Sequence, residues 1–265
     1  MFRDQQNYRA VAFRAPHIEE LGDLTCFFPP RTVTKAEQTV PSSRGFEVMH
    51  CYYWSPDQFT RAEIPSEFQK RVSGVRYYRY NMYFFQTSSP KGKVFFVALP
   101  FLRMALDVYP RIKDAARGTG IRYQTVDLEA LLKAVKQNRH LDGAITITRA
   151  RFKVAGDELT DTLLVSGQDV PHSGVVRTVF PAMDKLSIAA KAERLRLSVA
   201  GTSLRFNLEL DDAGHYKFWL AKNAYNLPAM AVVMPYLHKE GLVAETTSFP
   251  YMRSLREEEE EQDDG

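Results

Sequence analysis

The sequence predicts an α+β protein, built mainly from antiparallel sheet with about three or four helices. Apolar and polar residues alternate strictly over 195–199, 204–210 and 216–220, and turn sequences rich in Gly, Ser and Asp separate these segments. This alternation predicts a C-terminal three-stranded meander. The next segment, 227–239, begins after the capping residue Asn226, and we expect it to cover the apolar face of the meander as a packing helix.

A second signal for antiparallel sheet is the segment 68–106, which contains seven Lys and Arg residues and no Asp or Glu, a net charge of +7. Tyrosines and phenylalanines interleave with these cations over 76–85, and the turn sequence 88–93 leads into the apolar run 94–99. This order of strand, turn and strand predicts a β-hairpin with a basic, aromatic surface. Its candidate binding residues are Arg76, Arg79, Tyr80, Lys91 and Lys93.

The remaining elements follow from apolar periodicity along the chain. Helices are expected at 100–117, where Pro110 should bend the chain, and at 125–138, where Thr125 can cap a stripe of leucines. Strands are expected at 8–15, 46–54, 144–154, 163–165 and 175–180.

The chain has 265 residues, of which 45% are apolar and 25% charged, as in an ordinary globular protein with one large domain or two small ones. We expect two lobes: an N-terminal β-rich lobe at 1–117, which carries the basic hairpin, and a C-terminal α+β lobe at 118–256. The last nine residues, 257–265, hold seven acidic groups and no basic one. Seven carboxylates repel one another in a compact form, so this acidic tail is expected to be disordered.

Without the acidic tail, the rest of the chain is strongly basic. The net charge of the whole chain is +3, so residues 1–256 carry about +10. A basic body predicts an anionic partner. Because the acidic tail is tethered to the same chain, we also expect it to compete with that partner for the basic surface.

The sequence argues against a disulfide framework, a membrane span and a bound cofactor. Cys26 and Cys51 are the only cysteines, so the expected compartment is reducing. The longest apolar run, 94–102, is far below the roughly 18 residues of a membrane span, and we expect a soluble cytoplasmic protein. The histidines show no metal-ligand spacing and no glycine-rich phosphate loop precedes a lysine, so neither a metal nor another cofactor is expected.

A second basic surface is expected on the C-terminal strands. By strict alternation, the strand at 144–154 places its three cations on the same face as Ile145 and Ile147. The outer face of the meander carries cations and an indole beside a single carboxylate, Glu209. The candidate binding residues of this surface are Arg149, Arg151, Lys153, Arg194, Arg196, Arg205, Lys217 and Trp219.

These two surfaces predict a protein that binds nucleic acid or another polyanion, because cations neutralise phosphates and aromatic rings stack on nucleobases. A metal-dependent nuclease is an alternative, and the sequence leaves open whether any catalysis occurs. The residues that would serve it are Asp157, Glu158 and Asp161, or Glu209, Asp212 and Lys217. A further alternative is a subunit that binds a protein partner through exposed aromatic residues such as Trp54 and Trp219.

Overall fold

The computed structural model describes residues 6–37, 45–60, 62–137, 145–155, 162–185, 189–199, 206–220 and 227–249. The strands are β1 (Gln6–Arg14), β2 (Val33–Lys35), β3 (Phe46–Ser55), β4 (Gln69–Val72), β5 (Val75–Ser89), β6 (Gly92–Leu99), β7 (Arg122–Val126), β8 (Ile145–Ala155), β9 (Thr162–Ser166), β10 (Ala189–Val199), β11 (Phe206–Asp211), β12 (His215–Leu220) and β13 (Val243–Thr246). The α-helices are α1 (Leu102–Ala115), α2 (Leu128–Lys136), α3 (Gly174–Lys185) and α4 (Met230–Lys239). Short 3-10 helices are η1 (Leu21–Phe27), η2 (Ser66–Phe68), η3 (Val170–His172) and η5 (Leu227–Ala229).

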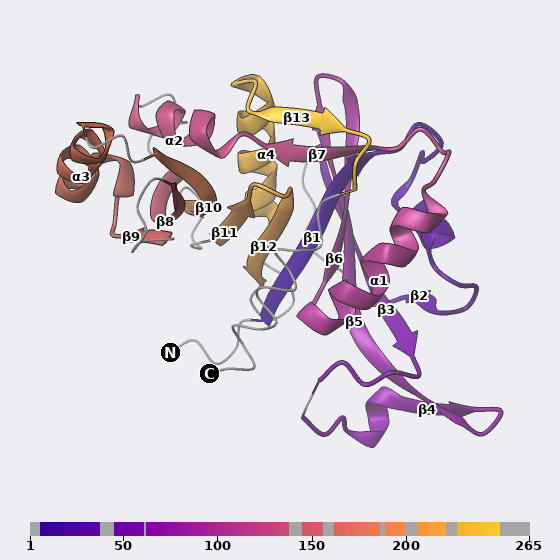
Figure 1. The fold of residues 1–265 in the computed structure, drawn as a ribbon. Helices are drawn as coiled ribbons and strands as arrows, with labels where there is room; N and C mark the ends of the chain where they lie inside the picture. The colour runs from indigo at the N-terminus through magenta and orange to yellow at the C-terminus, as the bar shows by residue number, and fades with distance from the viewer. Residues whose placement is uncertain are drawn as a thin grey trace.

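All the described strands belong to one sheet, which Figure 1 shows as a long, twisted layer. The strand order along its main path is β2-β3-β5-β6-β1-β12-β11-β10-β8-β9, and β4, β7 and β13 pair beside this path. The predicted α+β class with a mainly antiparallel sheet is confirmed. β1 pairs with β6 on one side and with β12 on the other, so residues of both expected lobes, 1–117 and 118–256, lie in the same sheet. The acidic tail, 257–265, lies outside the described residues.

Different helices cover the two faces of the sheet. On the face that we call the α4 face, helix α4 packs on β5 and helix α2 packs on β8 and β10, over one buried apolar cluster that includes Phe85, Phe96 and Phe218. On the opposite face, the α1 face, helices α1 and η1 cover the N-terminal strands, and Val108 and Ile112 of α1 pack with Phe13. Within the described residues, no helix is long and apolar enough to span a membrane.

The β5–β6 hairpin forms because a two-residue turn, Pro90-Lys91, joins two strands whose inward residues are large and apolar. Phe85 pairs with Phe96 across the strands, and their rings stack with centroids 4.4 Å apart and 9° between planes. Such a ring pair stabilises a fold by about 0.5–1.5 kcal/mol beyond the contribution of the apolar area that it buries. Gly92, at φ +114°, supplies the backbone conformation that closes the turn.

The other end of β5 pairs with β4, and together they form an arm (residues 69–79) that projects at the lower end of Figure 1. Val72 pairs with Val75, so the turn of the arm has only two residues, Ser73 and Gly74. Both have positive φ, at 50° and 83°, as a type I′ turn requires.

A bulge in β8 decides which of its side chains face the core. Arg149 pairs with Arg196, but Ile147 pairs with Leu197, so Thr148 is an extra residue on β8. One extra residue shifts the alternation of a strand by one position.

As a result, the apolar residues on both sides of the β8 bulge lie on the α4 face, where Ile147 and Phe152 are both buried. The basic residues of β8, Arg149, Arg151 and Lys153, lie on the α1 face. The prediction that they share a face with Ile145 and Ile147 is therefore wrong, because alternation alone cannot account for a bulge. A second bulge, at Glu193 of β10, keeps that strand in step with β8.

Two local predictions are also corrected by the structure. Residues 175–180 were expected to form a strand because of their β-branched residues, but they lie in α3. Ser173 closes the first turn of α3, since its Oγ accepts from the Val176 amide at 3.3 Å and its carbonyl accepts from the Arg177 amide at 3.2 Å. Asp127, and not Thr125, caps α2 by accepting a hydrogen bond from the Ala130 amide at 2.9 Å.

Gly214 closes the turn between β11 and β12 at φ +91°, and a Cβ there would lie 2.9 Å from Cγ2 of Thr125. We expect Gly214→Ala to lower the free energy of unfolding by about 2–4 kcal/mol, because the left-handed backbone strain adds to a steric clash with β7. Gly92→Ala is the matched control, since Gly92 also has positive φ but has no atom within 4 Å of an added Cβ. Urea denaturation of both variants measures the difference, and equal losses would show that the contact with Thr125 is unimportant.

Candidate nucleic-acid interface

A row of polar and mostly basic side chains crosses six strands on the α1 face. The pairing registers place its members opposite one another, strand by strand. From β9 to β1, this basic row consists of Ser166, Arg149, Arg196, Glu209, Lys217 and Arg9. Neighbouring strands lie about 4.8 Å apart, so the basic row spans roughly 24 Å and carries four cations and one carboxylate.

Strands β8 and β10 contribute more basic residues than the basic row alone. Their registers pair one cation with another at three places: Arg149 with Arg196, Arg151 with Arg194, and Lys153 with Lys191. We call these three pairs the cationic ladder. Like charges directly opposite each other destabilise an antiparallel strand pair, so the cationic ladder requires anions nearby.

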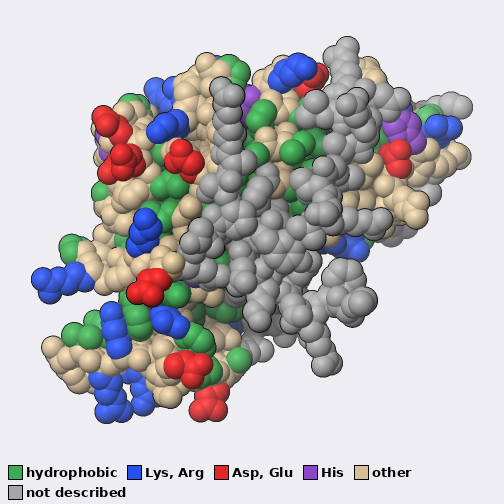
Figure 2. Space-filling view, turned by 180° about the vertical axis from the view of Figure 1, so that it is seen from behind, with side chains coloured by type: hydrophobic (Ala, Val, Ile, Leu, Met, Phe, Trp, Pro, Cys, Tyr) green, Lys and Arg blue, Asp and Glu red, His purple; other side chains and the backbone are tan. Residues whose placement is uncertain are grey.

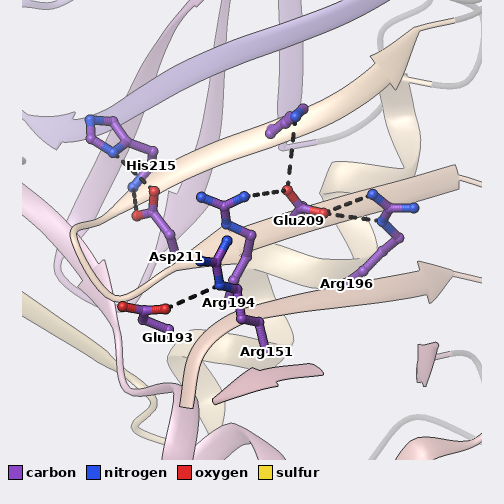
Figure 3. A network of polar contacts seen from close by, with 8 residues as sticks. Arg151, Glu193, Arg194, Arg196, Glu209, Asp211 and His215 are labelled. Atoms are coloured by element: carbon purple, nitrogen blue, oxygen red, sulfur yellow. Dashed lines mark hydrogen bonds and ion pairs between the residues drawn. The ribbon is translucent and has the colours of Figure 1, made fainter. Parts of the chain in front are cut away.

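Glu209 supplies most of the internal compensation, as Figure 3 shows. Its Oε2 accepts from Nε and Nη2 of Arg196, at 3.2 and 2.9 Å. Its Oε1 lies 3.8 Å from Nη1 of Arg194 and 4.0 Å from Nζ of Lys217. The Glu209 side chain is 7% exposed, whereas those of the three cations are 18–28% exposed. One nearly buried carboxylate therefore serves three cations from two neighbouring strands.

Other carboxylates compensate the charge of the cationic ladder less closely. Part of the cationic ladder has no carboxylate partner among the described residues. Glu193 lies 3.4 Å from Nε of Arg151, and Asp212 lies 3.5 Å from Nζ of Lys191. Nε of Arg149 donates to the neutral Ser166 hydroxyl at 3.3 Å. Within the described residues, neither Arg149 nor Lys153 has a carboxylate partner, and both are exposed. Strand β8 thus presents positive charge to solvent.

The same face holds a buried carboxylate paired with a histidine, Asp211 and His215 (Figure 3). Asp211 accepts from the His215 amide at 2.8 Å and lies 3.1 Å from its Nδ1. Burial would raise the pKa of Asp211, but the His215 contacts and the charge of Arg194 together hold it below its ordinary value. Tyr109 of α1 stacks near His215 and donates to the carbonyl of Arg9 at 2.7 Å, which anchors α1 beside the basic row.

Most of the C-terminal residues predicted from sequence are brought together on this face. Trp219 is among them, because Cζ of Arg196 lies 4.5 Å from the centroid of its ring. Such a contact contributes about 0.5–1 kcal/mol at a partly exposed site and holds the guanidinium in place. The residues that lie together are Arg149, Arg151, Lys153, Arg194, Arg196, Lys217 and Trp219. Arg205 lies outside the described residues.

The predicted residues of the basic hairpin are not brought together. Arg76 and Arg79 lie in the arm, whereas Lys91 and Lys93 lie at the opposite end of β5, roughly 35 Å away along the strand. Lys93 donates to the carbonyl of Glu19 at 2.7 Å. Tyr80 is buried, with 4% of its surface exposed, so its ring is part of the core and not of a binding surface.

Four cations of these strands were not among the candidate binding residues chosen from the sequence. Arg9 belongs to the basic row and Lys191 to the cationic ladder, while Lys70 and Arg71 lie on the arm. Lys70 and Arg71 belong to the acid-free segment 68–106, which was the available signal for them. No local signal marks Arg9, because only its pairing with β12 places it beside Lys217.

The acidic groups considered for catalysis do not form a common site in the part of the chain that the structure describes. Glu209 and Lys217 approach to 4.0 Å, but Asp212 is paired with Lys191. Asp157, Glu158 and Asp161 lie outside the described residues. The described residues contain no group of three His, Cys, Asp or Glu side chains that could hold a metal ion.

The lowered pKa of Asp211 predicts how stability depends on pH. A carboxylate with a lower pKa in the folded state than its unfolded value of about 3.9 stabilises the fold above that pH, and this contribution is lost as the pH falls through the folded pKa. We expect Asp211→Asn to remove about 1–3 kcal/mol of stability at neutral pH and to flatten the acid limb of the stability curve.

Thermal unfolding between neutral pH and about pH 2 measures this effect. Asp212→Asn is the matched control, because this substitution makes the same chemical change at an exposed side chain one residue away. A similar loss in both variants at every pH would contradict a special role for the Asp211–His215 pair.

Comparison with known proteins places the chain in no family. No family model matches the sequence, and no curated protein matches it closely enough to count as a relative. The function must therefore be argued from the geometry and charge of these surfaces.

Proposed function

We propose that this protein binds nucleic acid, or a polyanion of similar charge density, on the α1 face through the cationic ladder and the adjoining basic row. The observation that carries the proposal is the outer face of β8, where Arg149 and Lys153 are exposed opposite other cations and have no carboxylate partner among the described residues. An anionic ligand lying over β8 would relieve this repulsion.

A chain of phosphates suits the spacing of these cations better than a single small anion. Arg149, Arg151 and Lys153 follow one another at every second residue of β8, about 6.8 Å apart. Each cation that meets a phosphate releases a counterion, so several such contacts give an affinity that falls steeply with salt. Trp219 adds an indole beside Arg196, where a nucleobase or sugar could pack.

The acidic tail, 257–265, fits the same proposal as a tethered competitor. Its seven carboxylates would occupy the basic surface at an effective concentration on the order of millimolar. That is enough to compete with weak, nonspecific phosphate contacts. The nuclease and protein-interaction hypotheses remain predictions. No geometry among the described residues favours either of them over the binding of nucleic acid.

Charge reversal on β8 tests the proposal. We expect Arg149→Glu with Lys153→Glu to weaken the binding of a fluorescent oligonucleotide at least about tenfold at low salt, and to reduce the slope of log affinity against log salt by about two. Fluorescence anisotropy at several salt concentrations measures both quantities. The melting temperature should change little, because both side chains are exposed.

The matched control is Lys133→Glu with Lys136→Glu, which makes the same change in net charge at two exposed positions of α2. If both double variants weaken binding equally, the effect is one of total charge and the cationic ladder is not the site. Unchanged binding in the β8 variant would overturn the proposal.

A further inference from the structure

The arm presents aromatic rings and cations on the α4 face, separate from the cationic ladder. Strand alternation turns Lys70, Tyr77 and Arg79 to this face. Tyr52 and Trp54 of β3 lie beside them, since Trp54 pairs directly with Arg79. These five side chains are partly exposed. In Figure 2, Lys and Arg side chains gather on the arm at the lower left, together with hydrophobic ones.

Each cation on this face of the arm lies over a ring. Nζ of Lys70 is 3.9 Å from the centroid of the Trp54 ring. Cζ of Arg79 is 4.5 Å from the Tyr52 centroid and 4.6 Å from that of Phe68. The orientation of the Trp54 indole is fixed by a hydrogen bond, because its Nε1 donates to Oγ1 of Thr34 at 3.2 Å. The Trp54 ring is therefore held in one orientation, with a cation over its face.

The arm also carries unbalanced positive charge. Arg71 and Arg76 stand directly opposite each other, a destabilising arrangement. Among the described residues, no carboxylate pairs with these two arginines, with Lys70 or with Arg79, although Asp57 and Glu63 lie in the loop before the arm and Glu67 lies in η2. Val72 and Val75 at the tip are 49% and 47% exposed. The arm thus combines an anion-binding charge with exposed flat and apolar groups.

We infer that the arm binds single-stranded nucleic acid, with an unpaired nucleobase stacked on Trp54; the inference rests on the proposed function and names its ligand class. The ammonium of Lys70 stands over the Trp54 ring at a distance close to that of a stacked base. On binding, the base replaces this ammonium and Lys70 moves to the neighbouring phosphate. In a duplex, both faces of each base are already covered by neighbours, so a duplex offers the arm only phosphates and base edges.

Tryptophan fluorescence tests this contact directly. The chain has two tryptophans, so Trp219→Phe leaves Trp54 as the source of all tryptophan emission. We expect an oligothymidylate of about ten nucleotides to quench this emission on binding. An abasic oligonucleotide of equal length and a duplex with the same sequence should bind with little quenching, since neither offers an unpaired base.

Affinity gives the second measurement. Trp54→Leu should weaken binding of the oligothymidylate roughly 5- to 100-fold and leave binding of the abasic oligonucleotide unchanged, because only the stacking contact is lost. Trp54→Phe should recover much of the affinity, since it keeps a ring at this position. A melting temperature close to that of the parent protein confirms that each variant is folded.

The outcomes separate this inference from the proposed function. Equal quenching by the abasic oligonucleotide, or equal losses of affinity for both ligands, would show that the arm contacts phosphates only and would overturn base stacking. Binding that depends on Arg149 and Lys153 without any change at Trp54 would also overturn it, while the proposed function stands. If no nucleic acid binds at low salt, both fail.

Discussion

The charged half of the α1 face depends on one carboxylate, Glu209. A nearly buried charge costs several kcal/mol unless other groups solvate it, and here Arg194, Arg196 and Lys217 do so. The dependence also runs the other way, since Arg194 and Arg196 on β10 and Lys217 on β12 flank Glu209 from both sides and would repel one another without the carboxylate. Glu209 therefore bridges β10, β11 and β12 on the part of the α1 face where, among the described residues, these strands contribute to no buried apolar cluster.

The bulges of β8 and β10 make this division of the sheet possible. They switch the alternation of both strands, so that Ile147 and Phe152 face the apolar core and Arg149 and Arg151 face outward. Because the two bulges lie on paired strands, the cations of β8 stay opposite those of β10. Bringing so many cations together lowers the stability of the fold unless an anionic ligand or an internal carboxylate balances their charge.

The sequence predicts local features of this fold well, because they depend on neighbouring residues. Alternation located β8 and the turn chemistry located the β5–β6 hairpin. The prediction of a strand at 175–180 is wrong. The hydrogen bonds of Ser173 and the core packing of Val176 favour a helix there, in spite of the β propensity of the segment. The side of β8 occupied by its cations was predicted wrongly, since a single extra residue, Thr148, leaves no mark in the hydrophobic pattern.

The candidate site was predictable only in part for a related reason. The basic residues themselves could be recognised, but their partners depend on pairing between strands that are far apart in sequence. Arg9 joins the basic row only because β1 pairs with β12, which is far away in the sequence. Tyr80 is buried in the core because it points to the face opposite that of its neighbour Arg79. Which cations remain without a carboxylate follows from tertiary structure and not from composition.

We expect the cations around Glu209 to bind an external anion as well as this internal carboxylate, and the variant Glu209→Gln separates the two roles. The variant keeps the shape of the side chain but removes the charge that faces three cations, so we expect a lower melting temperature together with oligonucleotide affinity about three- to tenfold higher at low salt and a steeper salt slope. Glu240→Gln, at the end of α4, controls for the loss of one negative charge elsewhere. A loss of stability with unchanged or weaker oligonucleotide binding would show that the network around Glu209 is purely structural and that its cations do not bind nucleic acid.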